Sequence, residues 1–240
     1  MRIILFVMFF FIFSFTQYRL IADAQDDRRT INVSQIPQEG SAVKDFVPRG
    51  WIIEEQLAKD DLNGDTLPDV VLKLIEKPGA KKQEDTAEDR YRALVILLKT
   101  ADGKLRRAGV ATHLLQCTTC GGAFYGVVEA PANISVKKGV IIVKQDHGSR
   151  NVTETTYRFR YDQSLGKFVL IGLDIVDNDR ATGEVVDESI NYLTGVKITK
   201  ISRYNEKTEK YVPVSSKNTR VEITKKVLDD IDYEKIEFKE

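Results

Sequence analysis

The chain has 240 residues, and its 36 Lys and Arg side chains balance its 36 Asp and Glu side chains, so the formal net charge at pH 7 is zero. This balance argues against a nucleic-acid binder, which needs a basic surplus to contact phosphates. The length suits one large domain or two small ones.

The first 24 residues predict an export signal. Arg2 provides a short positive region, residues 3–15 form an apolar run interrupted only by Ser14, and residues 22–24 (ADA) match a small-x-small cleavage site. A membrane anchor is the alternative, but the run is shorter than the roughly 20 apolar residues of a spanning helix. We therefore expect cleavage after Ala24, a secreted or periplasmic location, and no membrane span after cleavage.

Residues 25–240 predict strands and turns almost throughout. The segment SAVKDFVP (41–48) predicts one helical turn, capped by Ser41 and ended before Pro48. Further along, TETTYRFRYD (153–162) alternates with a period of two, as a half-buried strand does, and Asp102-Gly103 is typical of a hairpin turn.

These patterns predict an all-β fold, an antiparallel meander of about ten strands. No repeat of fixed period is present, so a closed multi-blade propeller is not expected. A polar stretch at residues 174–182 (DIVDNDRAT) suggests a main β domain over residues 25–174 and a C-terminal β extension over 175–240. The extension is either a separate unit or part of the same domain.

The segment DLNGDTLPDVVL (61–72) carries the clearest chemical signal. Calcium prefers six to eight oxygen ligands, drawn from carboxylates, amides and backbone carbonyls. The predicted metal ligands are Asp61, Asn63, Asp65, Asp69 and the carbonyl of Leu67. The alternative is an Asx-rich turn that binds no metal.

The spacing distinguishes this loop from an EF-hand, which would place a bidentate Glu at position twelve, where Leu72 stands. The loop instead resembles the calcium hairpins of FG-GAP or VCBS-like repeats, found in integrin-alpha-type propellers, in which D-x-[DN]-x-D-G-x-x-D joins two strands. It departs from that pattern at position six, where Thr66 replaces the usual Gly. Because a β-branched residue resists a positive φ, this departure bears on calcium affinity.

Taken whole, the chain resembles exported bacterial proteins that carry a single FG-GAP-like loop near the N-terminus. The segments carrying this resemblance are PRGW, DLNGDTLPDVVL, CTTCGG, ISVKKGVIIVKQ, YRFRYD, FVLIGLD and SINYLTGVKI, in that order. The group has no activity to carry over, so the resemblance implies export and Ca²⁺ but no reaction.

Cys117 and Cys120 form a CxxC pair. In an exported chain, a close and even pair favours a structural disulfide. A thioredoxin-like redox site would need a βαβ setting that this sequence lacks. A zinc site that adds His113 and His147 is a further alternative.

Other chemistry is weakly supported. No G-x-S-x-G motif accompanies the two His residues, and paired carboxylates of a glycoside hydrolase cannot be recognised without distances. Aromatic side chains could form a recognition face or simply a core, namely Phe46, Trp51, Tyr125, Tyr157 and Tyr161.

The sequence therefore predicts an exported calcium-binding β protein that acts as a binding or structural module of the cell envelope with a protein or glycan partner, and it favours a non-enzymatic role. The alternative function is an extracytoplasmic thiol oxidoreductase or a hydrolase. The sequence leaves the oligomeric state open.

Overall fold

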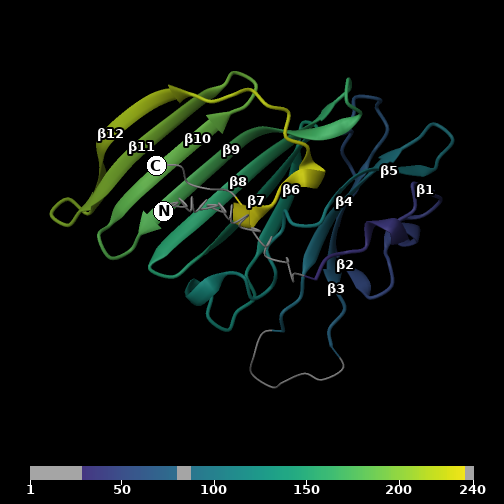
Figure 1. Cartoon of the computed structure of the whole chain (residues 1–240), viewed down its shortest axis with the longest axis horizontal. Helices are drawn as coiled ribbons and strands as arrows, with labels where there is room; N and C mark the ends of the chain where they lie inside the picture. Colours follow the sequence, from purple (N-terminus) through teal and green to yellow (C-terminus); the bar gives the residue numbers. More distant parts are fainter. Residues whose placement is uncertain (1–28, 80–87, 236–240) are drawn as a thin grey trace, which may run out of the picture.

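The computed structural model describes residues 29–79 and 88–235, which form two antiparallel β-sheets (Figure 1). The expected signal and its cleavage site after Ala24 lie outside the described residues. So does the centre of the charged loop between the third and fourth strands.

The first sheet has five strands in the order β1-β5-β4-β3-β2. Its strands are β1 (Glu39–Gly40), β2 (Trp51–Leu57), β3 (Val70–Glu76), β4 (Arg92–Lys99) and β5 (Leu105–Ala111). The sheet is a meander from β2 to β5, and the short β1 pairs with β5 at the edge. The β4–β5 turn contains Gly103 at φ 85°, which confirms the hairpin predicted from Asp102-Gly103.

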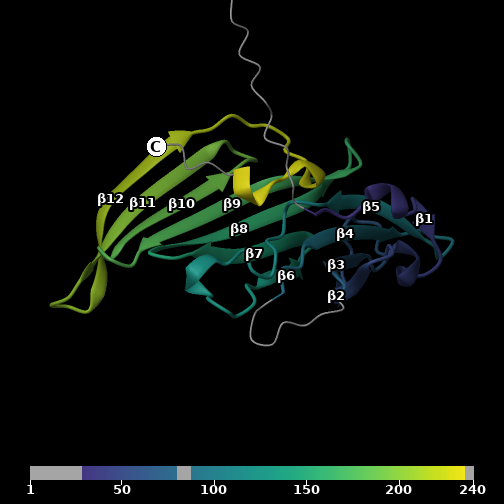
Figure 2. The same cartoon turned by 60° about the horizontal axis from the view of Figure 1, so that its bottom comes forward.

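The second sheet has seven strands in the order β12-β11-β10-β9-β8-β7-β6, again an uninterrupted meander. Its strands are β6 (Ala132–Lys137), β7 (Val140–Gly148), β8 (Asn151–Asp162), β9 (Lys167–Asp179), β10 (Glu184–Asn191), β11 (Val196–Asn205) and β12 (Lys210–Arg220). Figure 2 shows the sheet strongly curved, with β10 to β12 extending away from the five-stranded sheet.

Alternation along the strands of the first sheet divides the buried side chains between two cores. Val71, Leu94 and Ile96 join the core shared with the seven-stranded sheet, whereas Leu72 and Val95 face a second core. The second core is closed by the N-terminal segment through Ile31, Ile36 and Phe46, and Trp51 joins it from the start of β2. Each fully buried Leu or Val stabilises the fold by about 1.5–3 kcal/mol relative to an exposed one. β4 is therefore covered on both faces, which explains its continuous apolar run.

Residues 221–235, here called the C-terminal segment, cross one face of the seven-stranded sheet (Figures 1 and 2). Leu228 and Ile231 insert into the shared core, and the Leu170 amide donates to the Lys226 carbonyl at 2.9 Å. The side chain of Asp229 accepts from the Val110 amide at 3.1 Å and pairs with Lys167 at 2.8 Å. This segment thus contacts both sheets.

Five short 3-10 helices occur in the described residues, at Val33–Gln35 (η1), Val43–Phe46 (η2), Gly122–Phe124 (η3), Leu228–Asp230 (η4) and Tyr233–Lys235 (η5). η2 is the helical turn expected before Pro48, but Ser41 does not cap it. Ala42 is the N-cap residue, and Asp45 Oδ2 accepts from the amides of Ser41 and Ala42 at 3.0 and 2.9 Å. The turn is therefore held by a carboxylate that reaches back to the amides at and before its N-cap, and no described side chain caps its first amides.

The all-β prediction is confirmed, with twelve strands where about ten were expected, and the two open sheets of the described chain do not form a propeller. The proposed division after residue 174 falls inside β9, which pairs with β8 on one side and β10 on the other. Residues on either side of that position therefore belong to the same sheet.

Candidate functional site

The Asp-rich loop joins β2 to β3, as its flanking apolar runs predict. Asp69 lies just before β3 and is 2% exposed. Its carboxylate accepts hydrogen bonds from the backbone amides of Leu62 and Lys99, both at 2.8 Å. Its own amide donates to the Asp60 carbonyl at 2.8 Å. Asp69 therefore closes the base of the loop and ties it to the end of β4.

Asp61 organises the turn of the loop. Its Oδ1 accepts from the amides of Gly64 and Asn63 at 2.7 and 3.2 Å, and its Oδ2 accepts from the Thr66 amide at 2.8 Å. Partial desolvation opposes ionisation of this carboxyl, but hydrogen bonds from backbone amides, led by that of Thr66, hold its pKa below the usual range. The first carboxylate of the loop is thus stabilised in its charged form.

Asn63 and Asp65 form the exposed part of the loop. Asn63 Oδ1 accepts from the Asp65 amide at 3.0 Å, and Asn63 Nδ2 donates to Asp65 Oδ2 at 2.9 Å. Asp65 Oδ1 accepts from the amide of Leu67 at 2.8 Å. These are the local Asx-turn contacts that the metal-free interpretation predicts.

Thr66 has a φ of 71°, in the left-handed region that disfavours β-branched residues. The sequence argument expected resistance to this conformation. Instead, the chain adopts it two residues after Gly64, which has a φ of 86°. The Thr66 amide is thereby directed to Asp61, and the loop keeps the turn that a glycine would favour.

The carboxylates of the loop influence one another. Burial raises the pKa of Asp69, and repulsion from Asp65 and Asp61 adds to this effect, although the amides of Leu62 and Lys99 oppose it. In residues 29–79 and 88–235, no three His, Cys, Asp or Glu side chains are arranged as a group able to hold a metal ion. The oxygen donors suit calcium in kind, but their oxygens are directed at backbone amides.

The loop also contacts two turns of the other sheet. The side chain of Gln163, in the β8–β9 turn, donates from Nε2 to the Asn63 carbonyl. At Gly139, in the β6–β7 turn, an added Cβ would lie 3.2 Å from the Asp61 carbonyl oxygen. The loop therefore lies where the two sheets meet, so its conformation affects their contact.

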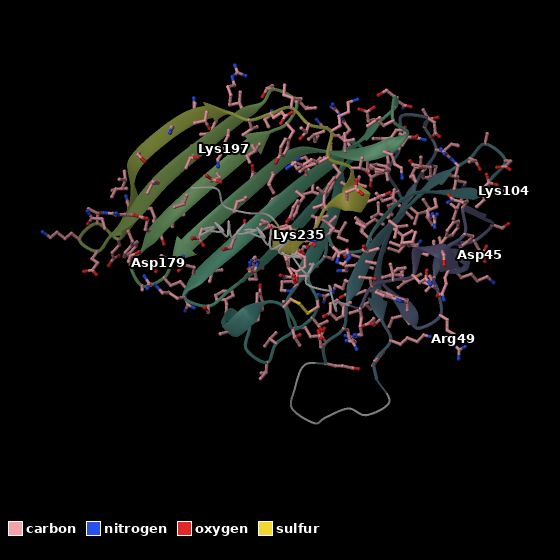
Figure 3. All side chains as sticks on the ribbon, in the orientation of Figure 1. Asp45, Arg49, Lys104, Asp179, Lys197 and Lys235 are labelled. Carbon is pink, nitrogen blue, oxygen red and sulfur yellow. A yellow bond between two sulfur atoms is a disulfide. The ribbon has the colours of Figure 1, made fainter. Side chains whose placement is uncertain are left out.

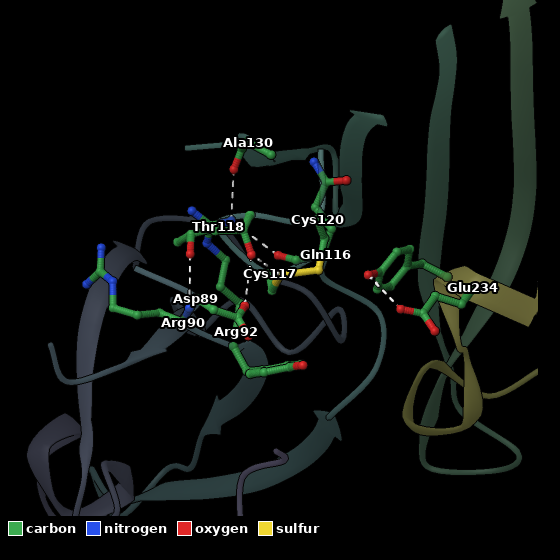
Figure 4. Close-up of a disulfide and its surroundings, with 12 residues drawn as sticks. Asp89, Arg90, Arg92, Gln116, Cys117, Thr118, Cys120, Ala130 and Glu234 are labelled. Carbon is green, nitrogen blue, oxygen red and sulfur yellow. Dashed lines mark hydrogen bonds between the residues drawn. A yellow bond between two sulfur atoms is a disulfide. The ribbon is translucent and has the colours of Figure 1, made fainter. Parts of the chain in front are cut away.

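The cysteine pair forms the expected disulfide, with 5.0 Å between the two Cα atoms (Figure 4). It lies in the connection from β5 to β6, and Cys117 is 3% exposed. The amide of Thr118, between the cysteines, donates to the Arg90 carbonyl at 3.1 Å, and the Thr118 carbonyl accepts from the Ala130 amide at 2.7 Å. The disulfide is therefore built into a loop that is hydrogen-bonded on both sides, and it occupies both sulfur atoms that a zinc site would need.

Arg92 is a buried residue that the sequence analysis did not single out. It is 3% exposed and lies at the start of β4. Its guanidinium donates to Glu54, at 2.9 Å from Nε, and to the carbonyls of Gln116 and Ala130 at 3.2 and 2.9 Å. It thus holds the disulfide-bearing loop against the five-stranded sheet. In the sequence, the only indication of this role is an Arg at the start of a continuous apolar strand.

The proposed recognition aromatics do not gather on one face. Phe46 and Trp51 belong to the second core, and Tyr157 is fully buried in the first. Tyr161 packs at the border of the first core, while Tyr125 Oη donates to Asp146 at 2.7 Å. Burial and this hydrogen bond raise the pKa of Tyr125 to about 12. Four of the five side chains therefore serve core packing, whereas the half-buried Tyr125 belongs to neither core.

Comparison with protein-family models, with curated proteins and with solved structures finds no match to this chain. The resemblance to FG-GAP-like loops therefore stays a prediction. Among the described residues, no helix has both the length and the apolar character needed to cross a bilayer. A disulfide fits an extracytoplasmic location.

Proposed function

We propose that this protein is an exported β protein that binds calcium through residues 61–69 and acts as a non-enzymatic binding or structural module of the cell envelope. The ligands would be the side chains of Asp61, Asn63, Asp65 and Asp69 and the carbonyl of Leu67. A bound calcium would supply positive charge that relieves the repulsion among three carboxylates.

One observation carries the proposal. Asp69 is buried against two backbone amides, and its pKa is raised by burial and by the charges of Asp65 and Asp61. A cation beside this carboxylate would offset both costs. The left-handed conformation of Thr66 adds support, because FG-GAP-like loops usually place Gly at this position.

Filling the site requires a local change. Asp65 and Asn63 are exposed or half-buried and bond mainly to each other and to neighbouring amides. Such side chains can turn inward without disturbing either core. Asp61 and Asp69 are held by backbone amides. Both oxygens of Asp69 and the Oδ2 of Asp61 accept one hydrogen bond each, so each keeps a further lone pair for a cation.

The rival proposal of a thiol oxidoreductase receives less support. Reactive cysteines lie in exposed, electropositive surroundings. Cys117 is 3% exposed, and both cysteines are in the disulfide. An unreactive disulfide under mild thiol treatment would exclude that function, and a count of free thiols measures it directly.

A thermal melt tests calcium binding. The protein is purified as processed by an exporting host, and it is melted in chelator and then in 10 mM calcium. For a site with a Kd of about 10⁻⁴–10⁻³ M, this concentration adds about 1.4–2.7 kcal/mol, or about 3–10 °C in Tm.

Asp65→Ala should abolish the shift, because Asp65 is an exposed ligand that fixes no other element. Asp102→Ala is the matched control: Asp102 also caps an exposed turn of the same sheet, through Thr100 at 2.5 Å, and its loss should leave the calcium shift intact. An equal rise with magnesium, or no rise with calcium, would refute the proposal.

A further inference from the structure

An open cavity of about 690 Å³ lies between the seven-stranded sheet and the C-terminal segment. Ligand sites in proteins usually measure about 300–1,000 Å³ and combine an apolar lining with a few polar groups. The lining here has more apolar than polar surface and is drawn from β9, β10, β11 and the C-terminal segment. Figure 3 labels Lys197 on β11 and Lys235 on that segment.

Strand register explains the floor of the cavity. Leu173 pairs with Ile190, and Ile190 pairs with Lys197, so their side chains lie on one face of the sheet. Leu173 is 3% exposed and belongs to the core, whereas Ile190 is only partly buried. Tyr192 continues the apolar floor, and Ile231 contributes from the C-terminal segment. Apolar side chains of the shared core thus continue into the lining of the cavity.

One wall of the cavity is formed by an ion pair whose carboxylate already has two hydrogen-bonding partners. Glu188 and Lys197 lie 2.6 Å apart, with side chains 13% and 18% exposed. Thr199 Oγ1 also donates to Glu188 at 3.2 Å. Because this carboxylate already has two partners, it is poorly placed to attract a cationic ligand.

The cations of the C-terminal segment differ in their partners. Lys225 pairs with Asp162 at 2.6 Å, and Lys235 pairs with Asp232 at 3.3 Å. Lys226 instead lies over the ring of Tyr192, with Nζ 5.2 Å from the centroid. Within residues 29–79 and 88–235, no carboxylate forms a salt bridge with Lys226. Lys226 is therefore the lining cation available to an anionic partner. Asp230, an exposed carboxylate of the same lining, likewise forms no salt bridge among the described residues.

We propose that this cavity binds an amphiphilic carboxylate with an extended apolar chain, of the fatty-acid class. The chain would lie on Leu173 and Ile190, and the carboxylate would pair with Lys226. The apolar floor favours the chain, and the lining carries four Lys against three carboxylates, Glu188, Asp230 and Asp232, which leaves it with a net positive charge. This site is independent of the calcium loop, and either proposal can fail without the other.

Calorimetric titration with decanoate tests the proposal, using the protein as processed by an exporting host. We expect saturable binding of one decanoate per chain. 1-Decanol, which has the same chain length without the charge, should bind about tenfold more weakly, as should decanoate to Lys226→Ala. Lys210→Ala is the matched control, because Lys210 is exposed in β12 outside the cavity lining, and it should bind like the unaltered protein.

Two further measurements locate the ligand. Ile190→Trp should fill the cavity and abolish decanoate binding, and its thermal melt shows whether it remains folded. Should it unfold, Lys226→Glu gives the same test through charge, with a loss larger than that of Lys226→Ala. The proposal is overturned if decanoate does not bind saturably, if decylamine binds more tightly than decanoate, or if neither Lys226 variant weakens binding.

Discussion

Asp69 and Asp65 provide the sharpest test of how the loop works, because the structure assigns them different roles. Asp69 accepts from the amides of Leu62 and Lys99 in a buried position, whereas Asp65 accepts from Leu67 at the surface. We expect Asp69 to stabilise the protein with or without calcium. We expect Asp65 to matter only when calcium is bound.

The magnitude follows from the hydrogen bonds lost in chelator. Asp69→Ala removes a charged acceptor from two backbone amides, each loss costing about 1.5–3 kcal/mol, and relieves the burial of one carboxylate. A net loss of about 3–4 kcal/mol is expected, which lowers Tm by about 6–16 °C for a chain of this size. Asp65→Ala removes exposed contacts and should cost at most about 1 kcal/mol.

Urea denaturation in chelator, followed by circular dichroism, measures both variants against the unaltered protein. Asp69→Asn serves as the conservative variant. Asn keeps the side-chain volume and one acceptor oxygen, but its NH2 group cannot accept from the second backbone amide. About half of the loss should therefore remain. Equal destabilisation by the Asp65 and Asp69 variants would refute the division of roles, and so would an Asp69→Ala cost below about 1 kcal/mol.

The same carboxyl predicts a pH dependence. Burial and neighbouring charges raise the pKa of Asp69 above the unfolded value of about 3.9, so the folded state binds this proton more tightly. The stabilisation linked to this proton is therefore complete below the unfolded pKa and is lost as pH rises through the folded pKa, whereas the hydrogen bonds from Leu62 and Lys99 remain at higher pH. Since a proton and calcium compete for this carboxylate, the Tm difference between calcium and chelator should shrink as pH falls towards that value. A difference that grows on acidification would contradict this reasoning.

Three further predictions concern other parts of the fold. Thr66→Gly should raise the free energy of unfolding in chelator by about 1 kcal/mol, because glycine tolerates φ 71°. Lys138→Gly, at φ 54° in another turn, is the control and should stabilise the protein similarly without changing its calcium affinity. Replacing Cys117 and Cys120 together by Ser should cost about 2 kcal/mol, as expected for closing a four-residue loop, measured by urea denaturation. Arg92→Met should cost about 3–5 kcal/mol, since two buried carbonyls lose their donor and Glu54 keeps only Lys73 among the described residues, at 3.9 Å. A smaller loss than that of the disulfide variant would contradict the anchoring role.

The sequence predicted the fold class well because strand periodicity and turn chemistry are local. The alternation in residues 153–162 matches β8, whose inward side chains are buried, and Gly103 marks the turn that it was expected to mark. Which strands share a sheet depends on the long connection from Ala111 to Ala132, whose fold is determined by contacts with distant residues. Local pattern could not predict the separation into five and seven strands.

The candidate site could be predicted in part from the sequence, because some of its contacts are also local. The spacing of Asp61, Asn63 and Asp65 does form a hydrogen-bonded turn, as both interpretations of the loop required. The role of Asp69 could not be read, because its second partner is Lys99, thirty residues away on β4. Arg92 was missed because its partners come from residues 54, 116 and 130, which only the fold brings together.

The half-buried strands β10 and β11 connect these observations to the proposed binding site. The cavity face of these strands carries Glu188, Ile190 and Lys197, and the five-stranded sheet does not extend over it in Figure 2. The C-terminal segment covers only part of that face and leaves the cavity beside Ile190. Lys226 lies beside the apolar floor and over the ring of Tyr192, and it forms no salt bridge among the described residues. That combination of incomplete cover and available charge favours ligand binding as the role of this face.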